Sequence, residues 1–297
     1  MKMKRSEKLG MLTGLVVGVL LLLISVFMIF QTTCKVWGAE KPANATQQGI
    51  DVSSHQGKIN WEQVKTSALA DYAIIRCGYG VNQTDKDDKY WDYNSSECER
   101  LGIPYGTYLY SGADTTAKAK SEAEHVVRLL QGKNLTYPIY YDMEADMLNQ
   151  LSSTQIGNIA KTFLNTMESY GYKNVAVYSN KYLFETKLTA SVFSDYPKWI
   201  AQHSNKCTYQ GSYHMWQYST QGVIPGISEK VDLNYKIGNW TYAGYSSAKK
   251  TVVVKPKATT IKSLRKSGKK AVKITYKKVS GAVSYTHLRA HETSQDL

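Results

Sequence analysis

The sequence predicts an α/β protein whose main domain is an irregular, abbreviated (β/α) barrel, and three observations carry this prediction. Short apolar segments of strand length alternate with amphipathic segments of helix length over residues 48–241. About eight strand-like segments fall in this range, which is the number that closes a barrel of this kind. The segments between strands become too short for helices after Lys198, so fewer helices are expected than in a complete barrel. An open sheet also fits the alternation.

The expected strands are rich in β-branched and aromatic residues and are bounded by turn-forming residues. They span residues 49–53, 72–77, 105–110, 137–144, 174–179, 198–202, 213–218 and 231–233. The expected helices, which lie between the earlier strands, span residues 61–68, 91–101, 115–130, 153–170 and 181–189. Helices that separate strands in this way return the chain for parallel pairing, so the sheet is expected to be parallel.

The N-terminal region carries a candidate membrane segment. Residues 9–30 form an uncharged apolar run, long enough to cross a hydrocarbon core of roughly 30 Å as a helix. Residues 1–8 are basic, so we expect a cytoplasmic tail followed by a transmembrane helix or signal anchor that leaves the rest of the chain outside the cell. Residues 31–47 lack an apolar period and are expected to form a linker. The alternative is a signal peptide that is cleaved, with secretion of the remainder.

The C-terminal region differs in composition from the barrel. Residues 242–256 are rich in Ser and Lys and are expected to form a second linker. Residues 257–297 resemble the opening strands of a fibronectin type III module, which needs about 90 to 100 residues. The segment is therefore expected to be a truncated fragment of such a module. Its last part, residues 286–297, continues neither the pattern nor the composition, and we assign it no function.

The distribution of charge argues against nucleic-acid binding. The net charge is +13, but residues 249–285 alone hold twelve Lys and Arg and no acidic residue, whereas residues 42–248 hold 18 basic and 20 acidic residues. The main domain is therefore almost neutral, and its basic flank suits an anionic envelope polymer, a membrane surface or simple solvation. The four cysteines form no C-x-x-C pair. Cys77 and Cys98 are expected either to pair or to be buried thiols.

The most informative short motif is Asp142-Met143-Glu144, at the end of an expected strand. Side chains alternate between the two faces of a strand, so Asp142 and Glu144 are expected to share one face. Parallel α/β folds place their chemistry at this end of the strands. Two neighbouring carboxyl groups repel when both are ionised, which leaves one of them protonated near neutral pH. A proton donor beside a carboxylate is the arrangement that cleaves glycosidic bonds.

Two further carboxylates are expected beside this pair. Asp51 lies in the first expected strand, within the motif G-I-D-V-S-S-H-Q-G, and Asp232 lies in the last, within V-D-L-N. The first and last strands of a closed barrel are neighbours, so both carboxylates are expected to face the same opening as Asp142 and Glu144. Four carboxylates would then line one cleft.

Together these motifs resemble family 25 of the glycoside hydrolases, the Chalaropsis-type lysozymes. The resemblance rests on G-I-D-V-S-S-H-Q-G, the strand ending in D-x-E, W-Q-Y at residues 216–218 and V-D-L-N, and it covers about residues 48–240 in the family's order. It implies an irregular (β/α) barrel that hydrolyses the β-1,4 bond between N-acetylmuramic acid and N-acetylglucosamine in peptidoglycan, with net retention. No cofactor, metal or nucleic acid is implied, and the catalytic domain is expected to be monomeric.

The resemblance also implies roles for the four carboxylates. Glu144 is the general acid that protonates the leaving oxygen and later the base that activates water. Asp142 is either the nucleophile or the group that orients the substrate's acetamido group for its own attack. Asp51 and Asp232 are supporting carboxylates that hold the acid and set its pKa.

Residues near the expected strand ends are candidates for binding sugars, because flat amphipathic rings stack on them. The candidates with rings are Tyr79, Tyr110, Tyr178, Trp199, Trp216 and Tyr218. Gln217 is a candidate because its amide could hydrogen-bond a sugar acetamido group, although it could also simply end a strand. Two other classes of function remain open: a glycan-binding barrel without turnover, and a chitinase-like glycosidase that also carries D-x-E on a barrel strand. The intact carboxylates disfavour the first, and the flanking motifs fit the second poorly.

Overall fold

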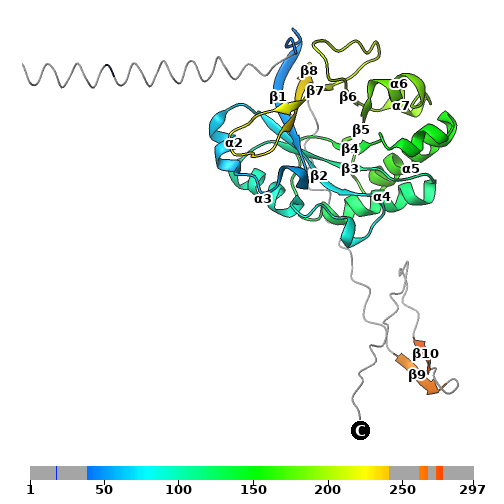
Figure 1. Ribbon diagram of the computed structural model, residues 1–297. Helices are drawn as coiled ribbons and strands as arrows, with labels where there is room; N and C mark the ends of the chain where they lie inside the picture. The colour runs from blue at the N-terminus through cyan, green and yellow to red at the C-terminus, as the bar shows by residue number, and fades with distance from the viewer. Residues whose placement is uncertain (1–17, 19–38, 241–260, 267–271, 277–297) are drawn as a thin grey trace, which may run out of the picture. The chain divides into compact units, whose positions relative to one another are not determined.

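The computed structural model describes Gly18, residues 39–240, 261–266 and 272–276. The chain divides into two compact units, Met1–Ser246 and Ser247–Leu297. In the first unit, eight strands close into a barrel in chain order (Figure 1). The strands are β1 (Ala45–Val52), β2 (Tyr72–Tyr79), β3 (Tyr105–Tyr110), β4 (Ile139–Asp142), β5 (Val175–Asn180), β6 (Lys198–Ala201), β7 (Met215–Gly222) and β8 (Val231–Ile237). The α/β barrel prediction is therefore confirmed, and the open sheet is excluded.

The direction of β8 departs from the predicted parallel sheet. Strands β1 to β7 pair in parallel, whereas β8 pairs antiparallel with both β7 and β1. A parallel return needs a connection of about a dozen residues or more. Residues 223–230 are too few for one, so β7 and β8 form a hairpin. As a result, the beginning of β8, and not its end, lies at the opening where the parallel strands end.

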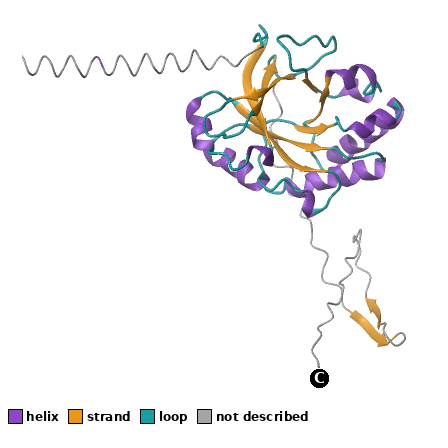
Figure 2. Cartoon of the chain, viewed as in Figure 1, coloured by secondary structure: helices purple, strands orange, loops and turns teal. Residues whose placement is uncertain are grey.

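The helices lie outside the barrel (Figure 2). They are α2 (Trp61–Ser67), α3 (Trp91–Leu101), α4 (Thr116–Leu129), α5 (Ser153–Ser169), α6 (Lys181–Thr186) and α7 (Val192–Asp195). Side chains cap the beginnings of four of them: Asn60, Thr115, Ser152 and Asn180 each accept a hydrogen bond from a backbone N–H of the first turn. Between β5 and β6, two short helices replace the single expected helix 181–189. No helix follows β6 within the described residues, as the short connections indicated.

Two apolar layers follow from the alternation of side chains along the strands. The outer layer packs the strands against the helices, and its members include Ile75, Leu109, Phe163 and Ile200. The inner layer fills the barrel with the side chains of Tyr72, Ile74, Tyr137, Tyr140, Ala176, Tyr178, Trp199, Ala201 and Met215. Trp199 is central, with ring centroids 4.3 Å from Tyr178 and 4.9 Å from Tyr140. Cys77 and Cys98 are buried free thiols.

Two expected boundaries are corrected. β1 begins at Ala45, inside the predicted linker 31–47, because Ala45 and Gln47 pair with the end of β8 at Ile237 and Lys236. β4 ends at Asp142, so Glu144 lies in the loop that follows and not on the strand.

The terminal predictions fall largely outside the described residues. This holds for the cytoplasmic tail 1–8, the linker 242–256 and, apart from Gly18, the apolar run 9–30. In the part of the chain that the structure describes, no helix is long and apolar enough to span a membrane. In the second unit, β9 (Ile261–Lys266) and β10 (Val272–Tyr276) form an antiparallel pair. This pair lies within residues 257–297, the predicted fibronectin type III-like fragment.

Candidate active site

The structure brings the four predicted carboxylates together at one end of the barrel. Asp51, Asp142, Glu144 and Asp232 line a cavity of about 70 Å³. The cavity is completed by the side chains of Tyr108, Tyr178, Trp199 and Gln217. It lies at the carboxyl ends of the parallel strands, where barrels of this type carry their chemistry.

Strand register explains why these carboxylates meet. Asp51 in β1 pairs directly with Asp232 in β8. Asp142, the last residue of β4, lies between Tyr110 of β3 and Tyr178 of β5. The short loop after β4 then returns Glu144 to the same cavity. A parallel β8 was expected. Because β8 is antiparallel, Asp232, near its beginning, lies at the opening.

Two amide side chains hold Asp51. Its Oδ2 accepts hydrogen bonds from Asn234 Nδ2 at 2.7 Å and from Gln217 Nε2 at 3.0 Å. Asn234 is oriented in turn by Trp199, whose indole Nε1 donates to Asn234 Oδ1 at 2.8 Å. Gln217 Nε2 also lies 3.4 Å from Asp232 Oδ2. Buried carboxylates require such donors, and here the donors come from β7 and β8, the last two strands of the barrel.

Burial and mutual repulsion raise the pKa of all four carboxyl groups. Burial, followed by the charge of Asp232, raises the pKa of Asp51 well above its ordinary value. For Asp142 the causes are burial and the charges of Glu144 and Asp51, opposed by Arg76. Burial and the charge of Asp51 raise the pKa of Glu144, and burial raises that of Asp232 to about 6. The cluster therefore holds protons at a pH where isolated carboxyl groups are ionised, and it can act as a proton donor.

One oxygen of Asp142 is unsatisfied. Asp142 is 3% exposed, and its Oδ1 has no hydrogen-bond partner among the described residues. A buried carboxylate oxygen without a donor is costly, and such atoms in native structures often mark a functional site. The arrangement leaves Asp142 ready to receive a donor, or an electrophilic carbon, from a bound substrate.

The predicted sugar-binding residues lie in three places: at the cavity, on the surface, and in the outer apolar layer. Tyr178 and Trp199 line the cavity, and Tyr110 lies beside it, since burial and then the charges of Asp142 and Glu144 raise the pKa of its hydroxyl. Tyr79 is exposed and contacts Lys86, whose Nζ lies 5.0 Å from the ring centroid, and it does not line the cavity.

Trp216 and Tyr218 are the clear corrections. In β7, Met215 and Gln217 face the barrel interior, so the alternate residues Trp216 and Tyr218 face outward into the outer apolar layer. Trp216 Nε1 donates to the backbone oxygen of Gln202 at 2.8 Å, and Tyr218 stacks on Tyr235. Neither residue lines the cavity.

Sequence reasoning missed three residues of this site. Tyr108 lines the cavity and lies two positions before Tyr110 on the same face of β3, so period-two alternation was the available signal. Asn234 belongs to the V-D-L-N motif, but its contact with Asp51 arises only from strand pairing. His203 donates to Gln217 Oε1 over 3.0 Å, and no local pattern distinguishes it from other histidines.

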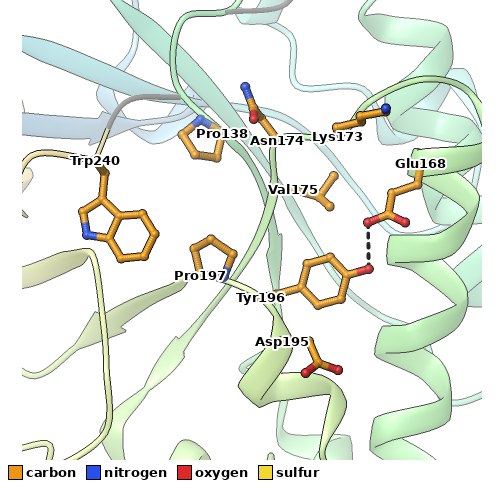
Figure 3. Close-up of a pocket in the computed structure, with 9 residues that line it drawn as sticks. All are labelled: Pro138, Glu168, Lys173, Asn174, Val175, Asp195, Tyr196, Pro197 and Trp240. Carbon is orange, nitrogen blue, oxygen red and sulfur yellow. Dashed lines mark hydrogen bonds between the residues drawn. The ribbon is translucent and has the colours of Figure 1, made fainter. Parts of the chain in front are cut away.

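A larger cavity of about 480 Å³ lies at the opposite end of the barrel (Figure 3). Its walls include Pro138, Val175 and Pro197, which lie at the beginnings of strands β4, β5 and β6, and Trp240. There Tyr196 donates its hydroxyl hydrogen to Glu168 at 2.8 Å. The acidic residues in the lining of this cavity are Glu168 and Asp195 in place of a group of four carboxylates, and its end of the barrel normally serves stability. The smaller, carboxylate-lined cavity is therefore the candidate active site.

Comparison with known proteins agrees with this assignment. The model of the family described as "Glycosyl hydrolases family 25" matches residues 50–227. The autolytic lysozyme of Clostridium acetobutylicum is 29% identical over 188 residues, which cover 63% of this chain and 55% of that protein. The modular autolysin LytC of Streptococcus pneumoniae is 33% identical in structural alignment, with a TM-score of 0.59, over 64% of this chain and 46% of that chain.

A third similarity concerns the fold alone. A family 25 glycosyl hydrolase from Bacillus anthracis has a TM-score of 0.59 at 20% identity, and the match covers 69% of this chain and 95% of that chain. By contrast, the chain spans only about half the length of the clostridial and pneumococcal relatives, 55% and 46%.

The raised pKa of Asp232 predicts a pH-dependent gain of stability in the Asp232→Asn variant. Folding raises this pKa from 3.8 to about 6, so the folded state binds the proton more tightly than the unfolded state. That contribution is fully present below pH 3.8 and is lost as the pH rises through about 6. Asn carries no ionisable proton, so the variant should be more stable than wild type by about 1–3 kcal/mol at pH 7 and nearly equal to it at pH 3.5. Urea unfolding at both pH values measures the difference.

A matched control is Asp85→Asn, which removes an exposed carboxylate, with 72% of its side chain accessible, from the same barrel. It should leave the free energy of unfolding unchanged at both pH values. Equal stability of Asp232→Asn and wild type at pH 7 would contradict the costly burial of this carboxylate.

Proposed function

The chain belongs to family 25 of the glycosyl hydrolases, and from this premise we propose that it is a peptidoglycan hydrolase, an N-acetylmuramidase. It cleaves the β-1,4 bond between N-acetylmuramic acid and N-acetylglucosamine with net retention. The observation that carries the proposal is the pair Asp142 and Glu144, two residues apart in one cavity and both with a raised pKa. The names of the relatives support it, since one is an autolytic lysozyme and another an autolysin whose structure includes a complex with a synthetic peptidoglycan ligand.

Glu144 is the general acid. Arg76 opposes the effect of burial on Asp142 and favours the ionised form of that residue. Glu144 is also the less buried of the two, which suits a group that must reach the glycosidic oxygen. After the bond breaks, the ionised Glu144 takes a proton from the attacking water.

Asp142 acts on the sugar whose bond is cleaved. Its unpaired, buried Oδ1 either attacks the anomeric carbon or accepts the N–H of the acetamido group, whose oxygen then attacks. Both routes pass through two inversions and give net retention. Trapping of a glycosyl-enzyme of increased mass with a slow substrate would distinguish the first route from the second.

The proposal is tested by the new ends that the full-length chain creates in purified peptidoglycan. After borohydride reduction, mass spectrometry should find reduced muramic acid. Reduced glucosamine would contradict the muramidase assignment and indicate a glucosaminidase. Cleavage of chitin in place of peptidoglycan would indicate the chitinase-like alternative, and binding to the wall without any new ends would indicate a glycan-binding module.

The Glu144→Gln variant serves in the same assay. It keeps the shape of the side chain and removes its proton transfer, so the rate should fall by at least about 100-fold without loss of the folded state. Glu124→Gln, on the surface of α4, is the matched control and should retain the wild-type rate. A Glu144→Gln rate above about a tenth of wild type would exclude Glu144 as the acid.

The charge of Asp51 predicts the direction of a pH shift. This charge helps to raise the pKa of Glu144, so Asp51→Asn should lower that pKa. Because the acid works only while protonated, the alkaline limb of the pH profile of kcat/KM should move to lower pH, by up to about one pH unit. Asp195→Asn, at the opposite end of the barrel, should leave the limb in place. An unmoved limb in Asp51→Asn would remove Asp51 from its supporting role.

The location of the enzyme is part of the proposal. Residues 9–30 anchor the chain in the cell membrane with the catalytic domain outside, as the uncharged apolar run and the basic residues before it support. The region 257–297 is the opening part of a fibronectin type III-like module. We expect the catalytic domain to act as a monomer, since described residues of a single chain already bring four carboxylates to one cavity. Retention of the intact chain in carbonate-washed membranes supports the anchor, whereas a shortened, soluble chain indicates cleavage and secretion.

A further inference from the structure

The side-chain amide of Gln217 links two carboxylates, Asp51 and Asp232, to Tyr178 and His203. Its Nε2 donates to Asp51 Oδ2 at 3.0 Å and lies 3.4 Å from Asp232 Oδ2. Its Oε1 accepts the hydroxyl hydrogen of Tyr178 at 3.0 Å. The predicted role of Gln217 in binding a sugar acetamido group is not what these contacts favour, because protein groups already occupy both ends of the amide. Gln217 organises the carboxylates, and its function depends on which end of the amide faces them.

His203 determines that orientation. Its Nε2 lies 3.0 Å from Gln217 Oε1. An amide oxygen can only accept a hydrogen bond, so Nε2 must carry the proton. If the amide turned by 180°, its oxygen would face the carboxylate oxygens of Asp51 and Asp232, which accept from its NH₂ group in the observed orientation. A proton on Nε2 of His203 reinforces the observed orientation, because it donates to Oε1 from the other side.

The backbone that carries His203 is fixed to β7. The preceding residue, Gln202, donates its backbone N–H to the backbone oxygen of Gln217 at 3.1 Å. Its own backbone oxygen accepts from Trp216 Nε1 at 2.8 Å, and its side chain accepts from the backbone N–H of Thr208 at 2.8 Å. The backbone from which the imidazole extends is therefore held against β7, as suits a group that orients a catalytic network.

His203 also faces the acid. The titratable groups around the ring are Glu144 after β4, Tyr178 of β5, and the two carboxylates that Gln217 bridges, Asp51 of β1 and Asp232 of β8. A protonated ring places a positive charge beside Glu144 and lowers the pKa of that carboxyl, in opposition to the charge of Asp51.

We propose that His203 is a positioning residue of this active site: it holds Gln217 in the orientation that supports Asp51, and its ring acts on the charge of Glu144. The inference rests on the proposed function, since it assigns His203 to the carboxylates of that same site. It gives a role to a histidine that follows a residue whose backbone is hydrogen-bonded to β7. His203 itself makes no bond to the reacting atoms.

Two variants of the full-length chain separate the two effects. His203→Gln presents an amide N–H near the position of Nε2 but cannot become charged. His203→Phe keeps a ring of similar shape and loses both the hydrogen bond and the charge. Lys206→Gln, in the same loop and exposed, is the control for the loss of a positive charge at a distance from the carboxylates.

In assays on peptidoglycan, His203→Phe should lower kcat roughly tenfold, the effect of losing about one net hydrogen bond, with KM within about twofold of wild type. His203→Gln should restore kcat to within about twofold of wild type. In both variants the alkaline limb of the pH profile should move to higher pH, because the charge that lowers the pKa of Glu144 is absent. Lys206→Gln should change neither quantity.

A second readout does not depend on turnover. The carboxyl carbon of Glu144, assigned by the signal lost in Glu144→Gln, is titrated by ¹³C NMR in the wild type and both His203 variants. A higher pKa of Glu144 in both variants supports the proposal even if wild type proves inactive on peptidoglycan, in which case only the proposed function fails. An unchanged Glu144 titration, or unchanged kcat in a folded His203→Phe, would overturn the proposal while leaving the muramidase assignment intact.

Discussion

The antiparallel closure of the barrel is the interaction on which the rest of this structure depends. β8 enters between β7 and β1 with the opposite direction, and its register places Asp232 directly beside Asp51. The same register brings Asn234 within 2.7 Å of Asp51. Without this pairing, two of the four carboxylates and one of their donors would belong to different edges of an open sheet, and no single cavity would contain them.

Closure of the barrel buries the carboxyl groups, which costs free energy of folding and also raises the pKa values that the site uses. Four carboxyl groups lie in one small cavity, and burial is the largest cause of the raised pKa in each. The amides of Gln217 and Asn234 offset part of the cost at Asp51, and the indole of Trp199 fixes Asn234 from within the barrel. Among the described residues, no group donates a hydrogen bond to Asp142 Oδ1. Stability is thus lowered at the position where a substrate would supply the missing interaction.

The inner aromatic layer and the polar network work together. Tyr178 illustrates this, because its ring packs on Trp199 while its hydroxyl donates to Gln217. Packing below the cavity therefore restricts the orientation of the groups that line it. His203 completes the arrangement from the segment between β6 and β7, a connection without a helix in the described structure. The irregular half of the barrel thus supplies Gln217, Asn234, Asp232 and His203.

The sequence by itself determined the strands, most helices and the four carboxylates, because these features are local. Alternation along a strand and the two-residue spacing of Asp142 and Glu144 are both visible in a short window. Only the tertiary structure decided the direction of β8, the outward position of Trp216 and the contacts of His203 with Gln217. These depend on which residues, far apart in the chain, pair across the barrel closure. No local pattern encodes such a pairing, because its free energy comes from contacts that exist only once the barrel has closed.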